Sequence, residues 1–344
     1  MKRLATLAGL AALASVPLWL SNLYLLHVLI MTGIFIIAAM SLNLLLGYTG
    51  QLSLGHVAFF GIGAYTSSLM SLGFTVHLLP DWPVSLEPKP VWLSMLGGVG
   101  VAALCGWVIG RVSFKVRGAY FVIVTVSFAE VVRLVALNWV ELTQGPMALN
   151  NLPVLRLGMA GYELSFLRKP ANYYLVLVVA ALAYLLIRRL VNSRAGRAMI
   201  ALRENEALAA SVGIDVTRYL VLAALLSAGI AGAAGALYAH YVRIVDPEVF
   251  SFIYTVTMVI MVVTGGKGTL AGPLVGGLIF GLLPEGLRAL GIAPEIQWVS
   301  YGVLMILIVN FLPAGIVPAV AGVWRGRAAA AAAEPLTANE QASA

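Results

Sequence analysis

The run YLLHVLIMTGIFIIAAMSLNLLL occupies Tyr24–Leu46 and contains no Asp, Glu, Lys or Arg. A hydrocarbon core about 30 Å thick is crossed by roughly 20 helical residues, so this run is long enough to span a bilayer. Similar apolar runs recur along almost the whole chain and predict an all-α polytopic membrane protein with about ten transmembrane helices. The expected spans are Leu4–Leu20, Tyr24–Leu46, Leu52–Leu72, Val91–Gly110, Tyr120–Asn138, Tyr173–Ile187, Tyr219–His240, Phe252–Thr264, Leu270–Leu283 and Ile296–Phe311.

The composition supports this fold class and excludes several functions. The 344 residues are 61% hydrophobic and 10% charged, whereas about a quarter of the residues in soluble domains are charged. This excludes an ordinary soluble enzyme. The net charge of +7 comes from basic residues in short loops between apolar runs, which indicates orientation signals rather than nucleic-acid binding.

The sequence also lacks the usual patterns for binding cofactors. The single cysteine, Cys105, lies inside an apolar run, and the four scattered histidines give no metal-ligand spacing. No GxxxxGK(S/T) loop is present to hold nucleotide phosphates. We therefore expect no catalytic residue, metal or cofactor on this chain, so that any ATP must be bound by a partner subunit.

The distribution of Lys and Arg predicts the orientation. When the amino terminus is placed in the cytoplasm and the sides alternate over ten spans, most Lys and Arg fall on the inner side, and both termini are cytoplasmic. The predicted regions are a membrane anchor helix at 1–23, a transmembrane core at 24–313 with a cytoplasmic loop at 188–218, and a cytoplasmic, disordered tail at 314–344. The first region also resembles a signal peptide. We favour a retained anchor, because a multispanning protein needs no separate export signal.

The stretch SLNLLLGYTGQLSLGHVAFFGIGAY, Ser41–Tyr65, interrupts the apolar pattern with five glycines. Glycine frees the backbone, and unwound backbone that lines a cavity can offer polar groups to a solute in transporters. A tight turn between two spans with small-residue packing explains the spacing equally well. The candidate path or hinge residues here are Ser41, Asn43, Gly47, Tyr48, Gly50, Gln51, Ser53, Gly55 and His56.

A second glycine-rich stretch, TGGKGTLAGPLVGG, covers Thr264–Gly277. Its lysine is not followed directly by Ser or Thr, so nucleotide binding is discounted. We expect a turn that starts the next helix, with Lys267 on the cytoplasmic side and Gly265 and Gly266 as hinge candidates.

The longest inner loop, 188–218, is the most charged region of the chain. Arg197–Val212 has the pattern of one short amphipathic helix, which Gly213 would end, with Arg203 paired to Glu206. The loop is either a solvated connector or a helix that docks into a groove on a cytoplasmic motor.

Two ionisable residues fall inside the fifth predicted span. Glu130 and Arg133 are three residues apart, on one helical face, where they can neutralise each other away from lipid. A structural ion pair is favoured over a direct role of Glu130 in a translocation path, and both remain open.

Three motifs now support a resemblance that covers Leu25–Pro313. They are GYTGQLSLGHVAFFGIGAY, then RAMIALRENEALAASVGID followed by a span that ends AGALYAHY, and finally GGKGTLAGPLVGG. In this order and spacing they resemble the permease subunits of branched-chain amino-acid ABC importers, the LivM-like family.

The resemblance implies an ABC importer permease fold in the bacterial cytoplasmic (inner) membrane. It also implies several partners: a second homologous permease subunit, two cytoplasmic ATP-binding subunits and a periplasmic solute-binding protein. The segment that looks like the family's coupling segment to the ATPase comprises Arg203, Glu204, Glu206, Ala207, Gly213 and Ile214.

Other functions fit the sequence less well. A related importer for urea, amides or aromatic acids would share these motifs, because fold does not decide the substrate. A stand-alone ion-coupled carrier would need buried carboxylates, and Glu130 is the only clear candidate within a span. A membrane enzyme is least expected, since no set of nucleophile and base can be assembled from the motifs.

Overall fold

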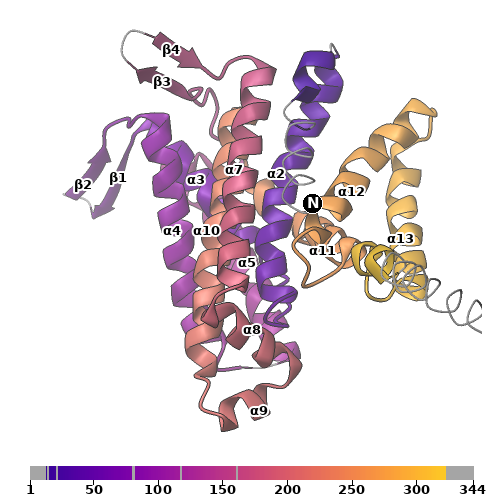
Figure 1. Cartoon of the computed structure of the whole chain (residues 1–344). Coiled ribbons are helices and arrows are strands. Elements are labelled where there is room, and N and C mark those ends of the chain that lie inside the picture. The colour runs from indigo at the N-terminus through magenta and orange to yellow at the C-terminus, as the bar shows by residue number, and fades with distance from the viewer. Residues whose placement is uncertain are drawn as a thin grey trace, which may run out of the picture.

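The computed structural model describes residues 13, 15–20, 22–79, 82–116, 118–159 and 162–322 of a mostly helical protein (Figure 1). Residues 13 and 15–19 are helical, and most of the predicted anchor at 1–23 lies outside the described residues. At the other end, residues 316–322 are helical, and the rest of the predicted tail lies outside the description.

The core of the molecule is built around α10 (Val216–Val242). This helix packs against α2 (Leu23–Leu46), α3 (Val57–Leu72) and α4 (Val91–Ser113). In its most apolar window 78% of the residues are buried, against 17% in α7 (Lys169–Val191), although the two helices are about equally apolar. Such outward-facing apolar side chains are expected where a helix meets lipid.

Small residues let the core helices approach closely. A Cβ on Gly63 of α3 would lie 2.2 Å from the Gly232 carbonyl oxygen of α10, and one on Gly235 would lie 1.8 Å from the Phe60 carbonyl oxygen. Only glycine fits at these crossings. Because lipid tails are as apolar as leucine, close contact between helices supplies much of the association energy that the hydrophobic effect supplies in water.

Three helices form a second group beside α2: α11 (Phe252–Gly265), α12 (Gly272–Ala289) and α13 (Pro294–Phe311) (Figure 1). A Cβ on Gly276 of α12 would lie 1.8 Å from the Met261 carbonyl oxygen of α11. The group contacts the core mainly through α2, and α11 also contacts α3, where the Val57 amide donates to the Thr255 hydroxyl at 3.1 Å, while α11 and α12 hold each other by their own close packing.

Two β-hairpins depart from the all-α expectation. The first pairs β1 (Phe74–Leu79) with β2 (Trp82–Leu86), and the second pairs β3 (Arg156–Met159) with β4 (Tyr162–Ser165). Their strands lie between the predicted spans, where the apolar pattern assigns no element, because two-stranded pairing depends on the partner strand as well as on local sequence. Figure 1 places both hairpins away from α8 and α9, which lie at the opposite end.

The apolar runs predicted most helix positions to within a few residues. Within the described part of the chain, five helices are long and apolar enough to cross a membrane: α2, α4, α5 (Ala119–Asn138), α7 and α10. Shorter apolar helices are α3 and α11. The third span was predicted from Leu52, but α3 begins at Val57, because the glycine-rich chain before it is irregular.

Short helices complete the connections between these elements. They are α6 (Val140–Thr143), η1 (Gly145–Met147), α8 (Arg194–Glu204), α9 (Glu206–Ser211) and η2 (Pro247–Phe250).

Candidate functional site

The end of α2 leaves the helical path at a glycine. The Gly47 amide still donates to the Asn43 carbonyl oxygen at 2.8 Å, and the Thr49 hydroxyl donates to the Leu45 carbonyl oxygen at 2.7 Å. Gly50 then adopts φ +75°, which an L side chain rarely adopts. The chain from Gly47 to His56 therefore forms an irregular connection rather than the start of the next helix.

Asn43 ties this connection to the second glycine-rich stretch. Its side-chain amide donates to the Thr269 carbonyl oxygen at 2.9 Å, and its Oδ1 accepts from the Gly268 amide at 2.9 Å. A Cβ on Gly47 would lie 2.3 Å from the Gly268 nitrogen, so the two stretches touch by backbone. Two motifs that are more than 200 positions apart in sequence thus meet at the end of α2.

Arg203 brings in the third motif. It lies in the last turn of α8, and its Nη1 donates to the Gly47 carbonyl oxygen at 2.8 Å while the guanidinium pairs with Glu204. The position of a Cβ on Gly50 is 3.2 Å from the Arg203 Cγ. We call the set Asn43, Gly47, Arg203, Gly268 and Thr269 the glycine junction.

The predicted single helix over Arg197–Val212 is wrong. The chain breaks between α8 and α9 at Asn205, which has φ −158° and ψ 106°. The Asn205 side chain accepts from the Leu208 amide at 2.9 Å and so caps α9. The predicted end at Gly213 is confirmed: it has φ +87°, and the following Ile214 amide donates to the Ala209 carbonyl oxygen at 3.1 Å.

The two short helices direct their apolar residues differently. On α8, Met199 is fully buried and Leu202 nearly so. On α9, Leu208 is 63% exposed, and Val212 just beyond it is 72% exposed. Glu206 and Ala207 form the first turn of α9, and Glu206 is only partly exposed, so this six-residue helix presents an apolar patch.

Ser41 and His56 lie deeper, between the core helices. The Ser41 Oγ is 2.7 Å from the His56 Nε2, and the Ser227 hydroxyl of α10 donates to the Ser41 carbonyl oxygen at 2.5 Å. Both residues are fully buried, and Tyr48 and Ser53 are nearly so. In this conformation the polar groups of the first glycine-rich stretch connect helices to one another.

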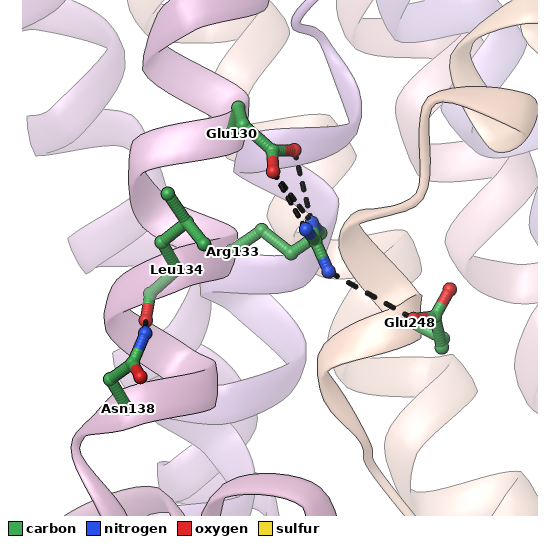
Figure 2. Close-up of polar contacts among 5 residues, drawn as sticks. All are labelled: Glu130, Arg133, Leu134, Asn138 and Glu248. Atoms are coloured by element: carbon green, nitrogen blue, oxygen red, sulfur yellow. Dashed lines mark hydrogen bonds and ion pairs between the residues drawn. The ribbon is translucent and has the colours of Figure 1, made fainter.

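Figure 2 shows the pair predicted in the fifth span. The Arg133 guanidinium donates to the Glu130 carboxylate, with Nη2 2.7 Å from Oε1 and Nε 3.0 Å from Oε2. It also reaches Glu248 of η2, at 4.0 Å between Nη1 and Oε1. The predicted ion pair is present, and Arg133 extends it from α5 to the segment before α11.

Comparison with known families agrees with these motifs. A family model described as branched-chain amino acid transport system / permease component matches residues 24–309. The chain belongs to this family.

Several named relatives of the permease agree with this family. It is 31% identical over 316 residues to the high-affinity branched-chain amino acid transport system permease protein LivM of Salmonella typhimurium, covering 84% of this chain and 68% of that protein. Identity to LivM of Escherichia coli K12 is 29% over 309 residues, with coverage again 84% and 68%. Identity to LivH of the same strain is 27% over 294 residues, covering 82% and 90%. None of the solved structures matches the chain.

The permease also has a cavity that sequence reasoning missed. It has a volume of about 410 Å³ and lies between α2, α11 and α12. At its edge the Tyr24 hydroxyl donates to the Glu285 carboxylate at 2.5 Å, and Arg288 contacts both residues. The i, i+3 spacing of Glu285 and Arg288 matches that of Glu130 and Arg133. This spacing is the sequence pattern from which the charged edge of the cavity could have been predicted.

The residues described in the permease contain no group of three or more His, Cys, Asp or Glu placed to hold a metal ion. Cys105 is a half-buried free thiol on α4.

Proposed function

We propose that this permease is one membrane subunit of an ATP-driven importer for branched-chain or related amino acids in the bacterial cytoplasmic membrane. It crosses the bilayer about ten times with both termini in the cytoplasm, next to a second homologous permease. Two cytoplasmic ATP-binding subunits and a periplasmic solute-binding protein complete the assembly. Family membership, the names of the relatives and the apolar helices support this proposal.

The contact between Arg203 and Gly47 is the observation that supports coupling of this subunit to ATP hydrolysis. The patch formed by Leu208 and Val212 is suited to a groove on the ATP-binding subunit, in the manner of an amphipathic helix that docks by its apolar face. Force applied to α9 reaches α8 across Asn205. Arg203 then passes it to α2 through the Gly47 carbonyl oxygen, and the glycine junction passes it to the loop before α12.

Alternating access follows from movement at this junction. Gly50 and Gly266 already have positive φ angles, so the chain on either side can rotate without steric strain from a side chain. Gly55 lies in a close backbone contact with Thr125 of α5, and Gly265 in one with Gly272 of α12, so movement of these helices would change both contacts. In the inward-facing state, polar side chains of the first glycine-rich stretch give up some of their present contacts and line the solute path; they are Ser41, Asn43, Gln51, Ser53 and His56. Glu130 stays paired with Arg133.

The test uses the complete assembly in proteoliposomes. Leucine uptake and ATP hydrolysis are measured together for the wild type, Arg203→Met and a matched control, Arg197→Met, which changes an exposed arginine of the same helix. We expect Arg203→Met to assemble normally and to lower leucine transported per ATP by roughly tenfold, since a hydrogen bond from a charged donor contributes about 1.5 kcal/mol or more. Arg197→Met should behave as wild type.

A second pair of variants tests the docking surface. Leu208→Glu should weaken binding of the ATP-binding subunits, whereas Leu167→Glu, at an equally exposed leucine next to α7, should not. Normal coupling in both Arg203→Met and Leu208→Glu would exclude this coupling route. Leucine transport by the chain alone, without ATP-binding subunits, would contradict the proposal that the importer is driven by ATP. Uptake of urea instead of leucine would contradict the proposed substrate class.

A further inference from the structure

We propose that the 410 Å³ cavity between α2, α11 and α12 is a binding site for one zwitterionic amino acid with an apolar side chain, held by Glu285, Arg288 and Tyr24. This inference rests on the proposed import function and names the place where the solute first contacts this subunit. The volume lies within the range of about 300–1,000 Å³ for small-molecule pockets.

The charged groups at the edge match the two charges of the solute. The Glu285 side chain is only 17% exposed, whereas that of Arg288 is 58% exposed. A mostly buried carboxylate is costly unless it is paired, so its position at the end of an apolar helix beside a cavity suggests a charged ligand. The Arg288 Nη1 to Glu285 Oε1 distance of 3.4 Å leaves the pair loosely joined through the Tyr24 hydroxyl. Glu285 can accept from a solute ammonium and Arg288 can donate to its carboxylate.

The rest of the cavity suits an aliphatic side chain. Below the charged edge the wall is mostly apolar and is formed by Val28, Met31, Phe35, Ile253, Met261 and Phe280. A mainly apolar pocket with a few polar groups at one end is the general form of a small-molecule site. A neutral polar solute such as urea offers no opposite charge to Glu285 or Arg288, which would stay joined to each other through Tyr24, and it would leave the apolar wall without a contact.

The cavity is closed on the side toward the glycine junction. A Cβ on Gly281 would lie 2.3 Å from the Thr32 Oγ1, and one turn further a Cβ on Gly277 would lie 2.2 Å from the Ile36 Cγ1. The contact of α2 with α12 thus forms the floor. Tyr24 lies in the first turn of α2 and Arg288 in the last turn of α12, at the end that the proposed topology places outside. Pro284 lies inside α12 beside the cavity, and the helix continues through it to Ala289.

Cysteine labelling tests the site without relying on transport. Thr257 lines the cavity, and Thr257→Cys is made in a Cys105→Ala background within the complete assembly in nanodiscs. A membrane-impermeant maleimide should label it in the absence of solute, and in sealed vesicles only from the outer face. Leucine should slow labelling by roughly tenfold at saturation. Leucinol, which lacks the carboxylate, 4-methylpentanoate, which lacks the ammonium, and urea should each protect far less.

Charge variants in the same background complete the test. Glu285→Gln and Arg288→Gln should abolish protection by leucine and lower leucine uptake by roughly tenfold, while Glu87→Gln, which changes an exposed carboxylate beyond β2, should change neither. Absence of labelling, labelling only from the inner face, or labelling that leucine does not slow would each overturn the site. So would undiminished protection in both charge variants. ATP-driven leucine uptake by the wild type judges the proposed function separately.

Discussion

At the residue scale, buried polar side chains join elements that are far apart in the chain. Asn43 uses both atoms of its amide on the loop before α12, and Ser41 lies between His56 and Ser227. A polar group without water must find a partner inside the protein, so each of these residues fixes the position of a second helix or loop. The glycine-rich pattern identified the first member of each contact. The partners, 186 and 226 positions away, leave no local trace in the sequence.

The contact between His77 and Glu141 gives a pH dependence at this scale. The ring and backbone amide of His77 both donate to the Glu141 carboxylate, which lowers the pKa of this carboxyl group from its ordinary value. The contact therefore persists at any pH above the ordinary pKa of a carboxyl group and while pH falls past that value. It is lost when pH falls through the lowered pKa of Glu141. Amide exchange at His77, followed as pH is lowered, should show protection lost only there.

Two variants check the assignment. Glu141→Gln should lose most of the protection at His77 at neutral pH, and Glu87→Gln should keep it. Protection of His77 that is independent of pH in the wild type would show that another group holds this hairpin to α6.

At the scale of elements, long apolar runs were sufficient for the helices, because no other structure satisfies the backbone in lipid. Short elements were not predictable in the same way. The break at Asn205 depends on one side chain that caps α9, a local competition that helical periodicity does not register. The hairpins depend on pairing across a turn, and the Tyr24–Glu285 contact joins residues 261 positions apart.

Removing the cap tests the break between α8 and α9. Asn205→Ala should destabilise α9 by about 1 kcal/mol, which corresponds to roughly fivefold faster exchange of the Leu208 amide. Asn192→Ala is the matched control, since Asn192 donates to the Arg188 carbonyl oxygen at the end of α7 and does not accept from α9. Unchanged exchange at Leu208 in Asn205→Ala would mean that α9 is held by other contacts.

At the scale of the whole molecule, glycine sets how closely the helices pack. The crossing of α3 and α10 leaves no room for a Cβ on Gly235, whereas Gly100 on α4 has no atom within 4 Å of its Cβ position. Glycine therefore has a different role at these two positions of the same core. Gly235 is required for the close contact of α10 with α3, whereas a larger residue would fit at Gly100.

Two identical substitutions should therefore have opposite effects. Gly235→Ala should lower the melting temperature of the purified protein, because overpacking at a backbone contact costs about 1–3 kcal/mol. Gly100→Ala should leave the melting temperature unchanged or raise it slightly, because alanine is favoured over glycine in a helix by up to about 1 kcal/mol. Equal melting temperatures for the two variants would show that the α3–α10 crossing is looser than described.

The glycine junction also limits how this permease can change over evolutionary time. Asn43, Arg203 and Gly268 come from segments far apart in the chain, yet each binds the backbone of another segment or is bound by it. A substitution in one alters the fit of the other two, so we expect the three segments to change together. A chimera assembled from two permeases would have to take all three from the same parent.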